Sequence, residues 1–470
     1  MADTRIRSTD TALLSELSTL LGAGKVAPPS APYLADATEW SGLVGRADAV
    51  VLPERREDVA TLLAWCSSHD VVVTPRGGGT GLAGGAVPLD GGVVLSLERM
   101  TAIRRFDPLL WRIQVEAGLR TADLHRLARS NGLLFAPDPG ASEQSQIGGN
   151  IATNAGGPHA LKYGTTRAWV TGLEAILPGG ELLELGGPIR KDVAGYDLLG
   201  LLSGSEGTLA VITAAWLKLL PAPEVVLPLV ALYPDTAAGC AAIERVIGSG
   251  LQVAALDYLD AGAIAAAAAG FPAELPAAPG FMVIAEADGS ASEAGRLRDE
   301  LREALDEDLL ALHAPSTRKA IDALWRWRDG VGIAVAAQRS GKVSEDIVVP
   351  VDRLAQAIEE TIAIGARHEL AALSWGHAGD GNLHSTFLID PRDGAELERG
   401  HQAADELFGM AIALGGSISG EHGVGWLKRG QLARQWSPAA LALHDAVKQA
   451  FDPKNLLNPG KKPGAIAVRP

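Results

Sequence analysis

Pro75-Arg76-Gly77-Gly78-Gly79-Thr80-Gly81-Leu82-Ala83-Gly84-Gly85 is the stretch that decides the fold of this chain. It follows a predicted strand at 71–74, and its second half fits the G-x-G-x-x-G spacing of dinucleotide-binding loops. A Rossmann loop must open into a helix whose N-terminus holds the pyrophosphate. Here the loop leads through Pro88 to a second predicted strand at 93–97. The pattern therefore disfavours a Rossmann unit, although a row of backbone N–H groups in consecutive small residues still attracts phosphates.

Two further glycine-rich elements follow in the same half of the chain. The first, 146–157, lies within a region (137–157) that we predict to be mostly loop. The second, 203–209, nearly imitates a hydrolase elbow, but Ser203 replaces the first glycine and no strand–turn–helix pattern follows. Three glycine-rich loops in one domain suit a large cofactor with a pyrophosphate and an extended body.

Composition narrows the class of protein. A chain of 470 residues exceeds what one hydrophobic core usually serves, so we expect at least two domains. The net charge is −15 with no basic stripe, which argues against nucleic-acid binding. No signal peptide and no run of 18 apolar residues is present, so we expect a cytoplasmic protein, attached to a membrane only through a partner. Cys66 and Cys240 are the only cysteines, which disfavours disulfides and iron–sulfur clusters.

The order of predicted elements indicates an α+β chain. Helices are expected at 9–21, 58–69 and 121–130, and strands alternate with helices up to a proline-rich linker at 221–223. Beyond the linker we predict strands at 225–233 and 281–287 and helices at 237–249 and 292–305. This second part is typical of a mostly antiparallel sheet covered by helices.

Two histidines flank a turn in Trp375-Gly376-His377-Ala378-Gly379-Asp380-Gly381-Asn382-Leu383-His384. On a helix these imidazoles would lie about 10 Å apart, too far for one metal ion with bonds near 2 Å. A hairpin of strands at 370–375 and 383–389 would bring both to one end of the sheet. Glu421 would then complete a two-histidine, one-carboxylate set with open positions. The residue types alone leave a metal site and a purely structural role equally open.

Taken in order, these motifs resemble the FAD-linked 2-hydroxy-acid dehydrogenases. The matching segments are 75–81, 148–157, 205–208, 376–384, 420–423 and Asn458-Pro459-Gly460-Lys461, spread over nearly all of 40–462. The family is the glycolate/D-lactate dehydrogenase branch of the vanillyl-alcohol-oxidase, or PCMH-type, flavoproteins, and D-2-hydroxyglutarate dehydrogenase is similar. The resemblance implies a PCMH-type FAD-binding domain of two α+β subdomains, with an α+β cap domain whose sheet is mostly antiparallel.

The resemblance also implies domain bounds and cofactor contacts. It gives an N-terminal helical segment (1–39), the FAD-binding domain (40–222), the cap or substrate domain (223–430) and a C-terminal segment (431–470) that returns to the FAD domain. Thr80 stands where some relatives carry a flavin-linked histidine, so non-covalent FAD is implied. The residues expected at FAD are Pro75, Arg76, Gly77, Gly78, Gly79, Thr80, Gly81, Pro137, Asp138, Pro139, Ser142, Gly148, Gly149, Asn150, Thr153, Asn154, Gly156, Gly157, Glu206, Gly207, Ile212 and Asn458.

In metal-using relatives the matching residues bind a divalent metal, here His377, His384 and Glu421. Zinc is expected only through the resemblance, because the nitrogen and oxygen ligands also suit manganese or iron. His422 matches the active-site base, and Arg328 matches the arginine that grips the substrate carboxylate, with Arg326 as the alternative. Asn382 is a further candidate for a substrate contact or, equally, for plain turn formation.

The expected reaction is oxidation of a small D-2-hydroxy acid, D-lactate or glycolate, to the 2-oxo acid by hydride transfer to flavin. Electrons would leave to an external acceptor: a quinone, a cytochrome, an electron-transfer flavoprotein, an iron–sulfur subunit or oxygen. Gly332 and the position of Lys342 depart from the hydroxyglutarate pattern, so that activity is the alternative. A metal-dependent hydrolase and a non-catalytic FAD-fold subunit are rivals from other classes. The sequence leaves the oligomeric state open, a homodimer included.

Overall fold

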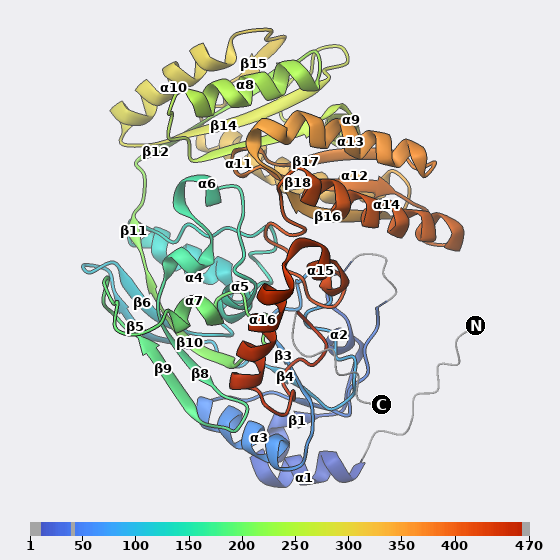
Figure 1. The fold of residues 1–470 in the computed structure, drawn as a ribbon. Coiled ribbons are helices and arrows are strands. Elements are labelled where there is room, and N and C mark those ends of the chain that lie inside the picture. Colours follow the sequence, from blue (N-terminus) through green and yellow to red (C-terminus); the bar gives the residue numbers. More distant parts are fainter. Residues whose placement is uncertain (1–10, 39–42, 463–470) are drawn as a thin grey trace.

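The computed structural model describes residues 11–38 and 43–462, which form two lobes stacked on one another (Figure 1). The first half of the chain and its last helices build the lower lobe, and a large sheet with helices builds the upper one. The predicted helix at 9–21 is present as α1 (Thr11–Leu21), and its first two expected residues lie outside the described ranges. None of the helices in those ranges is long and apolar enough to cross a bilayer.

The first sheet of the lower lobe carries the glycine-rich loop. Its order is β1-β2-β4-β3, with β1 antiparallel to β2 and the other pairs parallel. The strands are β1 (Val26–Ala27), β2 (Ala49–Val51), β3 (Val73–Arg76) and β4 (Val93–Ser96). Leu17 of α1 and Leu62 of α3 (Arg56–Ser68) pack into its core. No helix lies between β3 and β4, so the predicted departure from a Rossmann unit is confirmed.

The second sheet is antiparallel and has the order β5-β6-β10-β8-β9. Its strands are β5 (Ile103–Asp107), β6 (Arg112–Glu116), β8 (Val170–Ile176), β9 (Leu182–Gly186) and β10 (Val211–Lys218). The helices beside it are α4 (Thr121–Ser130), α5 (Ile147–Thr153), α6 (Ala160–Tyr163) and α7 (Leu198–Leu202), and β7 (Leu133–Leu134) pairs with β11 (Leu220–Pro221).

Helix α5 corrects the prediction that 137–157 is mostly loop. Ile147 and Ile151 lie one turn apart and are fully buried in the core of the second sheet. Two adjacent glycines made this segment look like a loop, but Gly148 packs so closely on Ala117 that a Cβ atom would lie 2.6 Å from the alanine Cβ. Burial of one apolar stripe and this close approach outweigh the low helix propensity of glycine.

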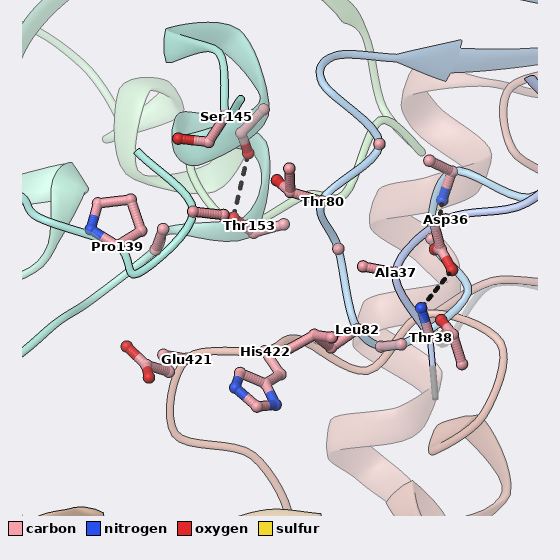
Figure 2. A pocket seen from close by; sticks show the side chains of 18 of the residues that line it. Asp36, Ala37, Thr38, Thr80, Leu82, Pro139, Ser145, Thr153, Glu421 and His422 are labelled. Carbon is pink, nitrogen blue, oxygen red and sulfur yellow. Dashed lines mark hydrogen bonds between the residues drawn. The ribbon is translucent and has the colours of Figure 1, made fainter. Parts of the chain in front are cut away.

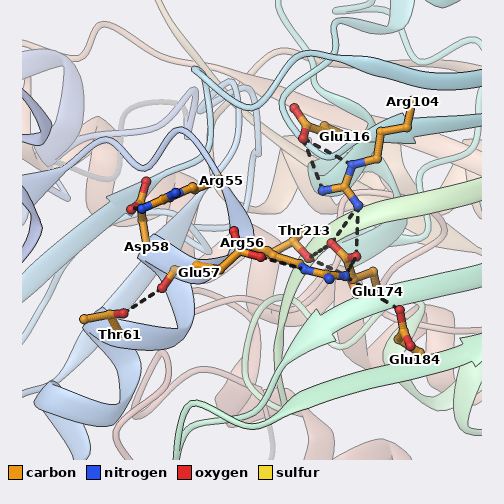
Figure 3. A network of polar contacts seen from close by, with 10 residues as sticks. All are labelled: Arg55, Arg56, Glu57, Asp58, Thr61, Arg104, Glu116, Glu174, Glu184 and Thr213. Atoms are coloured by element: carbon orange, nitrogen blue, oxygen red, sulfur yellow. Dashed lines mark hydrogen bonds and ion pairs between the residues drawn. The ribbon is translucent and has the colours of Figure 1, made fainter.

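A buried carboxylate joins the two sheets of the lower lobe (Figure 3). Glu174 on β8 accepts hydrogen bonds from Arg104 on β5 at 2.9 Å and from Thr213 on β10 at 2.8 Å. Arg56 at the start of α3 donates to the same carboxylate at 2.5 Å. Burial alone would raise the pKa of Glu174, but these partners hold it below its usual value. The network therefore ties helix α3, which packs on the first sheet, to three strands of the second.

The upper lobe is one seven-stranded antiparallel sheet, as the sequence predicts, in the order β15-β12-β14-β13-β17-β18-β16. The strands are β12 (Val225–Tyr233), β13 (Ala255–Asp260), β14 (Phe281–Gly289), β15 (Ala311–His313), β16 (Lys342–Val348), β17 (Ala372–His377) and β18 (Asn382–Leu388). The predicted hairpin around Asp380 is confirmed, because β17 and β18 pair with His377 opposite Asn382.

Helices cover both faces of this sheet. Along β12, Leu229 and Ala231 belong to one core and Val230 and Leu232 to the other, as the two-residue period of a strand requires. The first core takes side chains from α8 (Thr236–Gly248), α10 (Ala291–Leu305), α13 (Leu354–Arg367) and α14 (Gly394–Ala413). The second core takes them from α9 (Ala261–Ala267), α11 (Arg318–Asp329) and α12 (Val331–Ala337).

The end of the chain lies against the lower lobe, where α15 (Leu432–Gln435) and α16 (Pro438–Phe451) run beside the first half of the sequence (Figure 1). Leu457 forms a parallel bridge with Val73 of β3. The buried Lys461 ammonium donates to the carbonyl of Gly85 at 3.0 Å, and burial lowers its pKa to about 7. The tail therefore fixes the far side of the first glycine-rich loop.

Candidate active site

A cavity of about 1230 Å³ lies between the lobes and takes its walls from both. Its lower wall holds the glycine-rich loops, and its upper wall holds Arg328, Lys342, Trp375, His377 and His384. Figure 2 shows Glu421 and His422 on one loop, across the cavity from Thr80 and Thr153. The site predicted from three loops and two histidine motifs is therefore brought together in one space.

The lower wall offers backbone rather than side chains. A Cβ atom on Gly78 would overlap the carbonyl oxygen of Gln144, so only glycine fits where the loop meets the next wall. Gly79 has φ of 69° and packs on the guanidinium of Arg76. That guanidinium donates to the carbonyls of Pro32 at 2.6 Å and Ala86 at 3.3 Å, and burial lowers its pKa. Arg76 therefore braces the loop through these carbonyls while it also lines the cavity.

Most of the expected cofactor contacts line the cavity, but some do not. Pro137, Asp138, Ser142, Asn154 and Asn458 lie outside the lining. Asn154, with φ of 54°, ends α5 and accepts from the backbone N–H of Arg167 at 2.9 Å. Asn458 donates its amide to the carbonyls of Gly85 and Glu206 at 2.9 and 2.8 Å. Asn154 and Asn458 therefore hold neighbouring loops in place, and the FAD contacts that the resemblance implies for these five residues stay a prediction.

The three residues expected to bind a metal face one point. His377 Nε2 lies 3.5 Å and His384 Nε2 3.7 Å from Glu421 Oε1, and the three ligand atoms lie within 4.8 Å of one another. Tetrahedral bonds of 2.0–2.1 Å would separate such ligand atoms by about 3.3 Å. The donor set therefore fits a divalent metal with only a small contraction.

Strand alternation explains why these side chains converge. His377, His384, Asp257 and Asp346 all project from the sheet face that carries α11, because their strand neighbours such as Leu383 and Tyr258 belong to the opposite core. The sheet places β13, β17, β18 and β16 side by side, so one residue from each reaches the same area.

Asp257 is a central residue of the site that the sequence analysis missed. Its fully buried carboxylate accepts from Arg328 Nε at 2.7 Å and from His377 Nδ1 at 2.8 Å. Burial would raise the pKa of Asp257, but Arg328 and His377 lower it to about 2. Burial would likewise lower the pKa of His377, whereas Asp257 raises it to about 10. A charged residue inside the apolar strand 255–260 was the available signal.

Asp346 organises the loop that carries Glu421 and His422. One carboxylate oxygen accepts from the backbone N–H groups of Gly420, Glu421 and His422 at 2.8–2.9 Å. Burial alone would raise the pKa of Asp346, and the surrounding cations and donors hold it far below its usual value. Asn382 donates to the same residue at 2.6 Å and does not line the cavity. Asn382 thus helps to hold Asp346, and its contact with the substrate stays a prediction.

His422 stacks on His384 with ring centroids 5.3 Å apart. Within the described residues His384 Nδ1 has no hydrogen-bond partner, and burial followed by the nearby His422 lowers the pKa of His384 well below its usual value. A neutral imidazole is the form that binds metals. His422 is half-buried and borders the cavity, so its ring is the more accessible of the two.

Of the two arginines expected to bind the substrate carboxylate, Arg328 lines the cavity and Arg326 does not. Arg328 is 6% exposed, and its Nη2 has no hydrogen-bond partner among the residues the structure describes. Arg326 is exposed and donates back to the carbonyl of Asp322. Buried Lys342 also lines the cavity, with its ammonium 5.0 Å from the centre of the Trp375 ring. Two cations therefore face the space beside the histidines.

Comparison with known proteins identifies the class. Residues 47–186 match the FAD binding domain and residues 222–462 match the FAD linked oxidases, C-terminal domain. The chain resembles 4-ethylphenol oxidase from Gulosibacter chungangensis (TM-score 0.80, 19% identity, 97% of this chain and 98% of that one). It also resembles p-cresol methylhydroxylase (TM-score 0.81, 16% identity, 97% of each chain). The expected PCMH-type α+β fold is confirmed, and the protein is an FAD-dependent oxidoreductase.

The chain belongs to the family of FAD-linked oxidases. It is 38% identical to the glycolate oxidase subunit GlcD of Bacillus subtilis over 88% of each chain. It is 35% identical to proteins named D-lactate dehydrogenase from Anaerostipes hadrus, over 89% of this chain and 90% of that one, and from Archaeoglobus fulgidus, over 95% and 98%. These relatives confirm the resemblance drawn from the ordered motifs.

Proposed function

We propose that this protein oxidises a small 2-hydroxy acid, D-lactate or glycolate, to the 2-oxo acid. The observation that carries the proposal is that one cavity, whose opposite wall is made by the glycine-rich loops, brings five side chains together. They are Arg328, His422 and the set His377, His384 and Glu421. The names of the relatives, glycolate oxidase subunit and D-lactate dehydrogenase, support the same substrates. The division into an FAD domain (40–222), a cap (223–430) and a returning tail (431–470) is part of the proposal.

Arg328 would hold the substrate carboxylate. Its Nε is fixed on Asp257, so Nη2, which has no partner in the described part of the chain, is left to bind an anion. A guanidinium held in one orientation also fixes the plane of the carboxylate that it binds. The hydroxyl and Cα–H of the substrate would then lie in fixed directions.

His422 would remove the hydroxyl proton as the general base, because an imidazole nitrogen can accept a proton and its ring borders the cavity. A divalent cation on His377, His384 and Glu421, zinc in the first instance, would act as a Lewis acid that lowers the pKa of the substrate hydroxyl. Asp346 would keep His422 and Glu421 in place through their backbone N–H groups.

FAD, when bound, supplies the acceptor for the hydride that leaves the substrate Cα. The glycine cradle around Gly78 and Gly79 leaves room for the pyrophosphate close to backbone N–H groups. Thr80 has no nucleophile suited to a flavin bond, so the cofactor would be released from the protein by acid. The electrons would pass to an external acceptor, and its identity and a homodimeric state stay predictions.

A second candidate substrate is a dicarboxylate such as D-2-hydroxyglutarate. Lys342 favours it, because its buried ammonium lines the same cavity as Arg328. Against it, Gly332 stands where the hydroxyglutarate pattern has a threonine, so this position offers no hydroxyl beside Lys342; a Cβ there would be in ordinary contact with Lys342 Nζ at 3.5 Å.

The deciding experiment is anaerobic mixing of the purified protein with D- and L-lactate, glycolate and D-2-hydroxyglutarate. We expect loss of the oxidised-flavin absorbance with D-lactate or glycolate and a slower response to the L enantiomer. Faster bleaching by D-2-hydroxyglutarate would transfer the proposal to the second candidate. A flavin that none of these acids reduces would leave the non-catalytic subunit as the better account, and a colourless protein would favour the hydrolase.

A further inference from the structure

We propose that Asp257 is a positioning residue that links the substrate-carboxylate anchor to the metal site. This inference rests on the proposed function and adds one residue to it. Asp257 touches neither the cavity nor the three metal-facing atoms, yet its two carboxylate oxygens hold one group from each side of the reaction centre.

One oxygen of Asp257 fixes the tautomer of His377. The 2.8 Å contact from Nδ1 requires the ring proton to sit on that nitrogen, since a carboxylate can only accept. Nε2 is then the ring nitrogen left for a metal, and it faces Glu421 Oε1 at 3.5 Å. Carboxylates that orient metal-binding histidines in this way typically contribute 10–100-fold to metal affinity.

The other oxygen fixes Arg328. The 2.7 Å contact occupies Nε, and the guanidinium is buried with little room to rotate. Nη2 has no alternative hydrogen-bond partner in the ranges 11–38 and 43–462. Without Asp257 nothing on that side would hold the planar group at the angle that the substrate carboxylate needs.

An asparagine at 257 cannot serve both partners. Its single carbonyl oxygen accepts from either Arg328 or His377, and its amide N–H groups would face the other donor. If the amide turns toward His377, the ring must accept at Nδ1 and place its proton on Nε2, where the metal would bind. Asp257→Asn, which hardly changes the shape of the side chain, therefore breaks one of the two hydrogen bonds. Either His377 loses the contact that orients it for the metal, or Arg328 loses the contact that orients it for the substrate carboxylate.

Asp260 provides a matched control on the same strand. It is 4% exposed and accepts from the backbone N–H groups of Ala263 and Ser374 at 2.8 and 2.7 Å, away from the reaction centre. Asp260→Asn disturbs a buried carboxylate of the same kind without touching Arg328 or His377. It measures the structural cost that any such change on β13 carries.

The experiment uses the full-length flavoprotein in wild-type, Asp257→Asn and Asp260→Asn forms. Zn²⁺ affinity is measured by competition with a chromogenic chelator. Pyruvate affinity is measured from the perturbation of the oxidised-flavin spectrum at Zn²⁺ concentrations that saturate each form. We expect Asp257→Asn to lose at least tenfold in one of the two affinities and several-fold in the other, with the FAD content unchanged. Asp260→Asn should match wild type in both.

Wild-type Zn²⁺ and pyruvate affinities in Asp257→Asn would overturn the inference while leaving the proposed function intact. Equal losses in Asp260→Asn would also overturn it, because they would show a general effect on β13. A wild-type protein that binds neither Zn²⁺ nor pyruvate would instead refute the proposed function. Should Asp257→Asn be insoluble, Asp257→Ser is measured in the same way, since the smaller side chain leaves room for water and also removes both acceptors.

Discussion

The two walls of the cavity are built on opposite principles. The lower wall, made by the loops around Gly78, Gly149 and Gly156, offers backbone N–H groups, and a side chain added at Gly78 or Gly156 would collide with a neighbour. The upper wall, made by one face of the cap sheet, offers buried ionisable groups held by Asp257 and Asp346. The lower wall suits a large ligand that must be approached closely, and the upper wall suits proton and charge transfer.

This difference predicts how each wall responds to mutation. A wall that binds its ligand through backbone N–H groups is insensitive to changes of side-chain charge, but it loses the ligand when an added atom fills the space that the ligand needs. A side-chain site tolerates small steric changes but fails when a charge or a hydrogen-bond acceptor is removed, because buried groups are left without partners. Four experiments test this difference between the two walls.

The first adds bulk to the lower wall. Gly78→Val should reduce the flavin-to-protein ratio to near zero, because its side chain would overlap the Gln144 carbonyl oxygen, which the backbone cannot easily move. The ratio is read from the visible and ultraviolet absorbance of the purified protein. Gly24→Ala, where nothing lies within 4 Å of the added atom, is the control and should keep its flavin. A Gly78→Val protein that keeps its yellow flavin would show that FAD binding does not need glycine at position 78.

The second removes side chains from the upper wall. His422→Ala should slow anaerobic flavin reduction by about 10²–10⁴-fold with nearly unchanged substrate affinity, since a general base acts on a proton that moves in the transition state. Arg328→Ala should weaken both affinity and rate, because the anion contact exists already before reaction. Rapid-mixing kinetics over a range of substrate concentrations separates the two. Wild-type rates and affinities in both variants would show that the assignment of these residues is wrong.

The third tests a place where the two walls of the cavity meet. A Cβ atom on Gly156 would lie 2.8 Å from Glu421 Oε2, so Gly156→Ala should displace that carboxylate. We expect metal affinity to fall several-fold, measured by competition with a chelator, without loss of fold. Gly149→Ala adds the same methyl group where no protein atom lies within 4 Å and should leave metal affinity unchanged. Identical metal affinities in the two variants would show that the walls act independently.

The fourth and smallest effect concerns the polar contact between the lobes. His159 of the lower lobe meets Asp138 at 2.5 Å and Glu286 of β14 at 2.8 Å. Burial would lower the pKa of His159, but the two carboxylates raise it well above its usual value. The ion pairs therefore stabilise the fold fully below about pH 6.5, the usual histidine value, and this stabilisation is lost as the pH rises through the folded-state pKa.

His159→Gln should consequently lower the melting temperature most at pH 6, and the difference from wild type should shrink as the pH is raised to 9 and beyond. Thermal scans at each pH provide the measurement. His69, which lies on the surface of the lower lobe and is about half exposed, is the control. A difference for His159→Gln that grows with pH would contradict the sign of the effect.

Local patterns predicted much of this molecule. The cap strand 225–233, the helix 121–130 and the hairpin around Asp380 have strong periodicity or turn residues, and the structure contains all three. The convergence of His377 and His384 followed from that hairpin alone. Glu421 was proposed as the third ligand from its residue type, and the resemblance supported it, because no local signal shows that a loop far along the chain returns to this strand end.

Long-range contacts account for what the sequence did not reveal. Helix α5 is stabilised by burial of Ile147 and Ile151 against a sheet whose strands lie on both sides of it in sequence. Asp257 stands in a strand that resembles a plain core strand, and only the order β13-β17-β18-β16 brings it to His377. Propensity and spacing describe neighbours within a few residues, and they carry no information about which strands become adjacent.

The bridge between Val73 and Leu457 has a consequence for how the chain is made. Strand β3 ends its sheet, and the segment at Leu457 is what covers this open edge. A ribosome that adds 5–20 residues per second needs about 20–80 s to reach that segment after it has made β3. During this time the sheet edge beside the future cofactor site stays unpaired while the whole cap is synthesised. Stable capture of FAD is therefore expected only after the segment at Leu457 has been made.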